Sequence, residues 1–217
     1  MEKDGKDFRP IVIYLCANFG VMFLIGMILG AIYGPSAMNK IVELSGIVSF
    51  IISAIVAIIF IILYHQKLAK DARRLTKKDV ILIVVSSVVW LAISYTVTYI
   101  IQYFKVPMNN QELIASTFST SQILTILAAV IFAPFVEEML FRYSFSTLIK
   151  KDITFIIVSA VVFGLLHATN IAAIEYILMG AAFAFVYIKT DKNVIAAFLI
   201  HMINNFVAML SLFLLLK

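Results

Sequence analysis

The sequence contains little cysteine and little charge, and both shortages exclude whole classes of protein. Cys16 is the only cysteine among 217 residues, so the chain cannot form an internal disulfide or a cysteine-cluster metal site. Charged residues make up 13% of the sequence, about half of the ~25% that soluble proteins carry. Apolar residues make up 63%, more than a soluble fold of this length can bury. A soluble globular enzyme and a disordered chain are therefore excluded.

Long apolar runs dominate what is present. Spanning ~30 Å of hydrocarbon takes about 20 residues of helix. Seven runs reach or approach this length, namely Ile11–Tyr33, Ile47–Tyr64, Val80–Phe104, Ile123–Ile149, Ile153–Ala168, Ile171–Ile188 and Val194–Leu216. The sequence therefore predicts an all-α, polytopic transmembrane bundle of about seven helices. Pro134 lies inside the fourth run and predicts a kink or break there.

Two connections between the runs are long. We predict that His65–Asp79 is a basic inner loop and that Lys105–Ser121 is a polar outer loop. The first run is longer than the ~7–15 apolar residues of a secretory signal peptide, and no small-x-small cleavage site follows it. We therefore expect it to be a retained anchor helix.

Lysine and arginine set the expected orientation. With the N-terminus inside, the inner segments hold 13 of the 17 basic residues, the outer segments hold Lys40, Lys105 and Lys217, and Arg142 lies within a run. The net charge of +5 is therefore read as a topology signal and not as a nucleic-acid site. We expect a multi-pass membrane protein with its N-terminus inside.

Ionisable side chains inside the runs are few, and each costs about 2.5–3.5 kcal/mol to insert. They are Glu137, Glu138, Arg142, His167, Glu175 and His201, with Asn204 and Asn205 beside the last. Counting from the inner basic anchors at 1.5 Å per residue places Glu137, His167 and Asn205 ~20–22 Å deep and His201 ~14 Å deep. Three helices are therefore expected to bring polar groups together near the midplane.

The spacing of these residues also predicts how they face. Glu138 and Arg142 stand four residues apart with the acid first, which favours an ion pair on one face. Glu137 points about 100° away from Glu138 and is free to face another helix. His201 and Asn205 share a face in the same way, and so do Phe163 and His167.

A carboxylate and two imidazoles in a low-dielectric pocket suit hydrolysis by an activated water. One histidine can help to deprotonate that water, while a second histidine and an asparagine amide can donate hydrogen bonds to a developing oxyanion. Neither a Gly-x-Ser-x-Gly elbow nor a His-Glu-x-x-His helix is present in the sequence, which disfavours serine hydrolases and zincins. Each polar residue alone could instead join helices by hydrogen bonds, and Glu175, near an outer helix end, is read as interfacial or structural.

Three ordered motifs within Ser121–Leu210 resemble one family. They are Ala133-Pro134-Phe135-Val136-Glu137-Glu138-Met139-Leu140-Phe141-Arg142, Phe163-Gly164-Leu165-Leu166-His167 and His201-Met202-Ile203-Asn204-Asn205. They look like the APxxEExxFR, FxxxH and HxxxN elements of the CPBP family, the CAAX proteases and bacteriocin-processing enzymes also called Abi. The resemblance implies a catalytic bundle over 121–217, preceded by three helices and the basic inner loop over 1–120.

The resemblance also implies residue roles. Glu137 and His167 would activate the water, and His201 and Asn205 would stabilise the oxyanion as neutral donors. Glu138, Arg142 and Phe163 would support them. Tyr143 departs from the glycine that many members carry after the arginine.

Location, substrate and cofactor follow in the same way. The chain resembles bacterial members of the family, which implies a multi-pass protein of the bacterial cell membrane. The substrate would be a peptide or membrane protein within the bilayer, with no nucleic acid as partner. Zn²⁺ could be ligated by Glu137, His167 and His201, but we expect no cofactor. The ~8 Å depth offset between the histidines disfavours a shared ion, and Glu138, the one spare acid, is expected to be occupied by Arg142.

Two other functions are compatible with the sequence. A membrane immunity or scaffold protein of the same fold could bind a bacteriocin-like peptide without cleaving it. A transporter is a weaker alternative, because the sequence shows no internal repeat and only one polar cluster.

Overall fold

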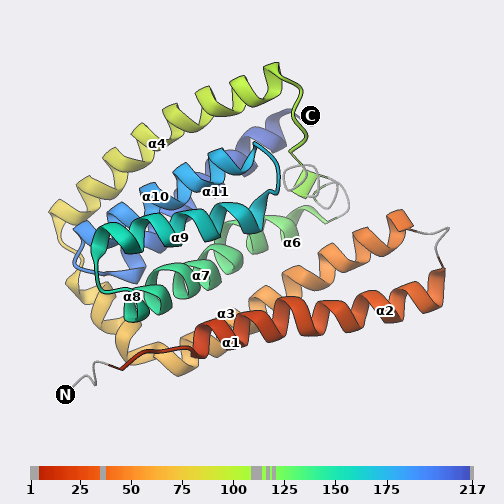
Figure 1. Ribbon diagram of the computed structural model, residues 1–217, viewed down its shortest axis with the longest axis horizontal. Coiled ribbons are helices and arrows are strands. Elements are labelled where there is room, and N and C mark those ends of the chain that lie inside the picture. Colours follow the sequence, from red (N-terminus) through yellow and green to blue (C-terminus); the bar gives the residue numbers. More distant parts are fainter. Residues whose placement is uncertain (1–4, 35–37, 109–113, 116–117, 119–120, 216–217) are drawn as a thin grey trace.

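The computed structural model describes residues 5–34, 38–108, 114–115, 118 and 121–215. Within these residues every regular element is a helix, and each of the seven predicted runs is helical (Figure 1). The helices are α1–η1–α2 (Arg9–Tyr33), α3 (Met38–Arg74), α4 (Lys77–Tyr103), α6–η3–α7–η4–α8 (Gln122–Leu148), α9 (Asp152–His167), α10 (Ala173–Lys189) and α11 (Val194–Leu215).

Five of these helices in the described residues are long and apolar enough to cross a membrane, counting α3 from Leu44. The other two, α9 and α10, have 16 and 17 residues. The chain is therefore a multi-pass helical membrane protein, as the sequence predicts.

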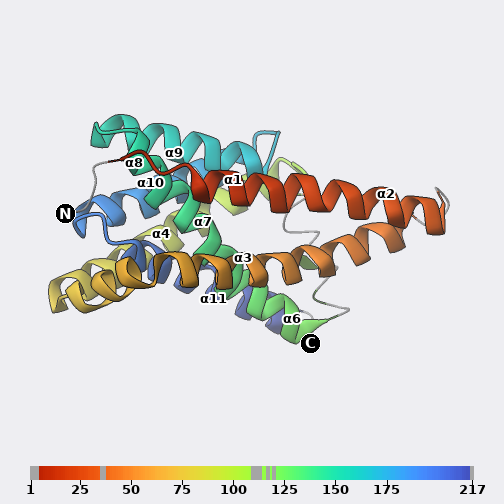
Figure 2. The ribbon, with the colours of Figure 1, turned by 90° about the horizontal axis from the view of Figure 1, so that it is seen from below.

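The C-terminal helices form a bundle around α7 (Ala133–Glu138). In Figure 1, α9, α10 and α11 run side by side, and α4 packs over α10 and α11. On the other side, α3 packs against α7, and α1 (Arg9–Leu15) packs against η4 (Met139–Ser144) (Figure 2). Buried apolar side chains such as Phe60, Phe163 and Phe183 fill the space between these layers. This arrangement places the motif-bearing helices at the centre.

A helical hairpin made by α2 (Met22–Tyr33) and the first half of α3 extends past the ends of α4 and α11 (Figures 1 and 2). None of the residues of α2 is buried. Its large apolar side chains, such as Phe23 at 67% exposed and Ile32 at 66%, suit contact with lipid. The hairpin is thus built for a membrane and not for a protein interior.

The pairing of α9 with α10 is unusually close, because small residues line it. A Cβ added at Gly164 would lie 2.3 Å from the Cγ1 of Ile177, and one added at Gly180 would lie 3.0 Å from the Cα of Ala160. Small residues at helix interfaces are the usual means of close backbone approach in membranes. Gly164 lies three residues before His167, so this packing helps to fix that histidine.

The segment predicted as a basic inner loop, His65–Asp79, is mostly helical, so that prediction is wrong. α3 departs from helical geometry at Tyr64 (φ −117°, ψ 16°), where the predicted span ends, and then continues to Arg74. α4 begins directly afterwards, because Thr76 and Asp79 form a capping box. A run of lysines and arginines does not stop a helix that has left the hydrocarbon.

This inner extension of α3 holds the start of α11. The buried carboxylate of Asp71 accepts the backbone N–H of Val194 at 2.9 Å and the Nζ of Lys67 at 2.9 Å. The Asn193 amide donates to the backbone carbonyl of Asp71, and its Oδ1 caps the N–H of Ile195. These bonds anchor α11 about two turns before His201.

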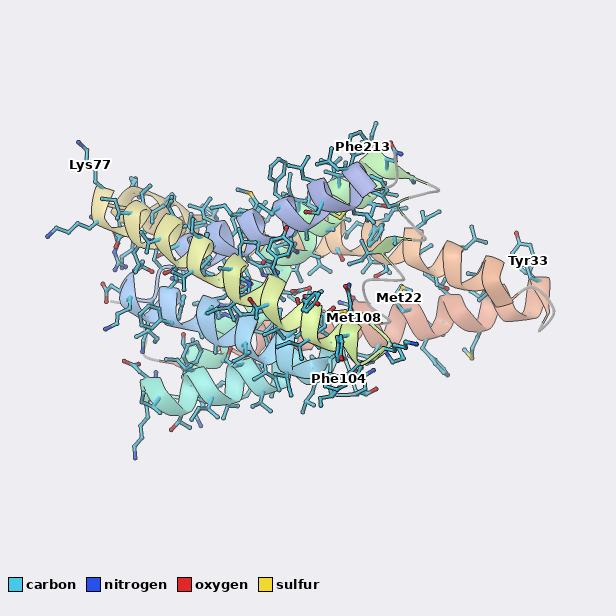
Figure 3. All side chains as sticks on the ribbon, turned by 90° about the horizontal axis from the view of Figure 1, so that it is seen from above. Met22, Tyr33, Lys77, Phe104, Met108 and Phe213 are labelled. Atoms are coloured by element: carbon cyan, nitrogen blue, oxygen red, sulfur yellow. The ribbon has the colours of Figure 1, made fainter. Side chains whose placement is uncertain are left out.

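The two ends of the molecule differ in chemistry as the charge count predicts. Lys77 lies at one end, Phe104, Met108 and Phe213 lie toward the other, and Tyr33 lies farther out still (Figure 3). Lys3, Leu216, Lys217 and most of the predicted polar loop Lys105–Ser121 lie outside the described residues. Phe118, within that segment, is buried and stacks edge-on with Phe213.

Candidate active site

The two glutamates of the first motif lie on a short α-helical stretch, α7, between two π-helical stretches. η3 (Ala128–Phe132) precedes α7, and η4 (Met139–Ser144) follows it. Of the kink or break predicted at Pro134, the break is absent, because the helix runs continuously over Gln122–Leu148. The chain widens into π turns instead, and π turns often occur at functional sites.

The π turn before Pro134 leaves the Ala129 carbonyl without its helical donor. The N–H of Ala133 bonds to the carbonyl of Ala128, so it does not reach the Ala129 carbonyl one turn back. The next residue is Pro134, which has no N–H. The Asn205 Nδ2 donates to the Ala129 carbonyl at 2.8 Å. Asn205 on α11 therefore completes the hydrogen bonding of the helix that carries the glutamates.

Glu138 and Arg142 form the predicted pair, and both side chains are fully buried. The Arg142 Nε lies 3.0 Å from the Glu138 Oε2, and its Nη1 donates to the Ser159 Oγ at 2.9 Å. The other Glu138 oxygen, Oε1, lies 2.9 Å from the His201 Nδ1. Arg142 therefore occupies Glu138, as expected, and His201 is a second partner of the same carboxylate.

Glu137 faces away from that pair, toward both histidines, as its position on the helix predicts. Its Oε2 lies 3.8 Å from the Nε2 of His167 and 3.8 Å from the Nε2 of His201. The predicted depth offset between the two histidines is therefore wrong for their rings, since both reach the same oxygen. Counting residues along straight helices does not include helix tilt or side-chain length.

The partners of the two Nδ1 atoms orient both rings. The His167 Nδ1 lies 2.8 Å from the Phe163 carbonyl, which can only accept, so we assign the hydrogen to that nitrogen. The His201 Nδ1 faces the Glu138 carboxylate and is assigned in the same way. Tyr176 stacks on His167 with ring centroids 5.0 Å apart. Both Nε2 atoms are thus held toward Glu137.

The remaining polar groups of α11 join a hydrogen-bonded chain that sequence reasoning missed. The Trp90 Nε1 on α4 donates to the Asn204 Oδ1 at 2.9 Å. The Asn204 Nδ2 donates to the Asn205 Oδ1 at 3.0 Å. Only the fact that Trp90 is the sole tryptophan made it distinctive in the sequence, and its partner could not be read from spacing.

The hydrogen bonds of Glu175 are separate from this network. Its Oε1 accepts hydrogen bonds from Ser94 and Thr98 of α4, both at 2.9 Å. The structural role predicted for it fits these bonds, but the side chain is buried, with 6% exposed, and is not interfacial.

Tyr143, the departure from the family pattern, has a partner near the N-terminus. Its hydroxyl donates to the Asp7 carboxylate at 3.1 Å, beside the Tyr64 hydroxyl at 3.0 Å. Burial acts to raise the pKa of Asp7, but the bonds from Arg9 and Tyr64 outweigh it and lower that pKa to about 2. The residue that replaces glycine thus ties η4 to the segment before α1.

The possible metal ligands do not fit a zinc site as they stand. Ligand atoms around tetrahedral Zn²⁺ at about 2.0–2.1 Å are about 3.3–3.4 Å apart, whereas Glu137 is 3.8 Å from each histidine. Within the described part of the chain, no three His, Cys, Asp or Glu side chains form a set that could hold a metal ion.

Comparison with known proteins agrees with this arrangement. Residues 119–207 match the family described as Type II CAAX prenyl endopeptidase Rce1-like. This match supports the resemblance of the chain to the CPBP family. A curated relative from Bacillus subtilis (strain 168), named "Putative membrane peptidase YdiL", is 24% identical over 218 residues, which cover 93% of this chain and 87% of the relative. No solved structure matches the chain at a significant level.

These comparisons support the general class of intramembrane protease, and together with the apolar helices they support a multi-pass membrane protein in bacteria. The matched region contains all three motifs and every predicted site residue. Neither comparison favours a binding-only immunity protein.

Proposed function

We propose that this protein is an intramembrane endopeptidase that cleaves a peptide or membrane protein with a water activated by Glu137 and His167. The observation that carries the proposal is the convergence of two imidazole Nε2 atoms on one carboxylate oxygen at 3.8 Å. That separation is too long for a direct hydrogen bond. A separation of 3.8 Å between the Glu137 Oε2 and the His167 Nε2 leaves room for a water that lies within about 2.8 Å of each atom.

The proposed step uses the two groups differently. The water gives one proton to the Glu137 carboxylate, and its oxygen forms a bond to the carbonyl carbon of the scissile peptide. The His167 Nε2 accepts the second water hydrogen and so orients the attack. When the tetrahedral intermediate collapses, the C–N bond breaks and the amine nitrogen takes the proton from Glu137.

His201 and Asn205 would stabilise the oxyanion. A neutral His201 that donates from Nδ1 to Glu138 has no hydrogen on Nε2, so the expected neutral donor needs revision. We therefore assign a hydrogen to each ring nitrogen of His201, which makes it a positively charged imidazolium that can donate from Nε2. The positive charge then balances the cluster, in which two carboxylates, Glu137 and Glu138, face one guanidinium and one imidazolium. Fixed donors aimed at a developing oxyanion supply several kcal/mol of stabilisation.

The test compares cells that carry the wild type with cells that carry Glu137→Gln, by mass spectrometry of released peptides. Glu137→Gln keeps the side-chain shape but cannot take the proton, so cleavage products should disappear. Glu175→Gln is the matched control, because it changes a buried glutamate of the same bundle whose hydrogen bonds come from Ser94 and Thr98. Products that persist in Glu137→Gln would overturn the mechanism, and products lost equally in both variants would point to misfolding.

We further propose that the reaction needs no metal. The geometry of the three groups supports this, and the proposed donors, His201 and Asn205, can stabilise the oxyanion without an ion. Purified protein should keep its activity on the peptide identified in cells after exhaustive chelation. Activity lost to a chelator and restored by Zn²⁺, together with loss of bound metal in His201→Ala, would refute it.

A further inference from the structure

The amide of Asn205 is positioned by a chain of hydrogen bonds that crosses three helices. It begins at the Trp90 Nε1 on α4, passes through Asn204 and Asn205 on α11, and ends at the Ala129 carbonyl in η3, with donor–acceptor distances of 2.9, 3.0 and 2.8 Å. Trp90 is buried, with 3% exposed, while the two asparagines are half-buried. The chain therefore connects a packed helix interface to the candidate active site.

The two ends of this chain fix its direction. An indole N–H can only donate, and a backbone carbonyl can only accept. The Asn204 oxygen must therefore face Trp90, which turns its Nδ2 toward the Asn205 oxygen. The Asn205 Nδ2 must then face Ala129, so neither amide can flip without losing bonds at both of its ends.

A second contact strengthens this assignment for Asn204. Its Nδ2 also lies 3.3 Å from the Met179 sulfur on α10, so both of its hydrogens have acceptors. Asn205 differs, because its Nδ2 carries two hydrogens and the Ala129 carbonyl accepts one. The other hydrogen remains to donate to a reacting group.

We propose that Trp90 and Asn204 are positioning residues for the peptidase reaction, which orient Asn205 so that its remaining N–H donates to the oxyanion. This inference rests on the proposed function, in which Asn205 is an oxyanion donor. Without Trp90, the Ala129 carbonyl alone fixes the direction of the chain. The Asn204 amide then turns over more readily, and in part of the population Asn205 presents its oxygen in place of its nitrogen. An oxygen there would repel the oxyanion.

The first test is kinetic and uses the peptide cleaved in cells. Trp90→Phe removes the indole N–H and keeps an aromatic ring, and it should lower kcat about tenfold with KM within about twofold, a part of the 10²–10³ that a whole oxyanion donor supplies. Tyr95→Phe is the matched control, because it removes another hydrogen bond between α4 and α11, that to Ser211. It should leave kcat unchanged.

A double-mutant cycle separates positioning from packing. If Trp90 acts through Asn205, the tenfold loss should vanish when Trp90→Phe is made in the Asn205→Ala background. An equal loss in both backgrounds would overturn the inference. If Asn205→Ala lowers kcat but Trp90→Phe does not, this inference fails and the proposed function stands. If Asn205→Ala retains full kcat, the oxyanion role fails and the inference fails with it.

The second test needs no substrate, because Trp90 is the only tryptophan. The ¹⁵N-labelled protein in detergent micelles should give one indole N–H signal that exchanges slowly with D₂O. Asn204→Ala should shift this signal and speed its exchange, Asn205→Ala should shift it less, and Tyr95→Phe should leave it in place. An indole signal that does not respond to Asn204→Ala would show that the chain is absent.

Discussion

The first and fourth membrane helices are both apolar, yet they differ in what their side chains contact. In the most apolar stretch of Arg9–Tyr33 no residue is buried inside the protein, whereas in that of Gln122–Leu148 56% are. The first helix turns most of its side chains outward, although α1 packs on η4, and the fourth places them against other helices and around Glu137. Composition alone does not distinguish the two.

The difference shows which kinds of interaction hold the bundle together. Lipid is as apolar as leucine, so burying apolar side chains gives little net drive for helices to associate in a membrane. The bundle instead contains the Glu138–Arg142 ion pair, the Asn205–Ala129 bond and the close approach of α9 and α10 at Gly164. The α2–α3 hairpin has no comparable polar network in the described residues. Disturbing the bundle should therefore cost far more stability than disturbing the hairpin.

The largest loss of stability should follow Glu138→Gln. Arg142 and Glu138 are both 0% exposed, so the substitution leaves the guanidinium buried without its counter-charge. Breaking a buried ion pair from one side costs about 3–5 kcal/mol. Unfolding of the purified protein by SDS in mixed micelles would measure this free energy.

The control for that loss is an ion pair at the inner surface. The Lys192 Nζ lies 3.5 Å from the Asp152 Oδ1, and both side chains are about half exposed. Asp152→Asn should cost less than about 1 kcal/mol, because water and salt screen such pairs. Similar losses in the two variants would mean that the network does not hold the bundle.

A smaller effect, with opposite signs in the two regions, should come from adding one methyl group. Gly164→Ala places a Cβ 2.3 Å from Ile177, and such overpacking costs typically about 1–3 kcal/mol. Gly26→Ala in α2 meets nothing within 4 Å, so it should stabilise the helix by about 0.5–1 kcal/mol. The same SDS titration compares both, and destabilisation by Gly26→Ala would show that the hairpin has a packed partner.

How much of this could be read from the sequence depends on the range of each interaction. The Glu138–Arg142 pair and the outward face of Glu137 follow from helix periodicity, because both concern residues within two turns. The seven spans follow from run length. The histidine depths were misjudged because they depend on how α9 and α11 tilt against α7, which no local pattern records.

The features that escaped prediction are long-range or depend on backbone detail. Trp90 lies 114 residues from its partner Asn204, and nothing in its own neighbourhood indicates that bond. The π turns beside α7 also escaped, although Pro134 gave a hint, since a missing N–H must leave some carbonyl to another donor. The inner extension of α3 was misjudged because charge was taken as a sign of a loop.

The two regions meet at Asp7, which no pattern in the sequence singles out. Its backbone carbonyl accepts a hydrogen bond from Ser144, and its backbone N–H donates to the Thr147 Oγ1 at 2.9 Å. Its carboxylate accepts from Tyr64 and Tyr143. The segment before α1 is thus fixed to α3 and to the helix that carries Glu137. A loss of stability in one region should therefore affect the other region through Asp7.

The smallest expected effect concerns the pH dependence of this link. The folded pKa of Asp7, about 2, lies below its ordinary value of 3.8, so the carboxylate is the form that stabilises the fold. Its contribution should be fully present above about pH 4 and should fade as the pH falls toward 2. Arg9, the main partner, is 63% exposed, so solvent screening limits the contribution to about 1 kcal/mol or less. Asp7→Asn removes the charge, so the gap in unfolding free energy between wild type and variant should narrow from pH 6 to pH 3. A gap that stays constant over this range would mean that Asp7 holds the two regions together through its backbone bonds alone, which the substitution leaves in place.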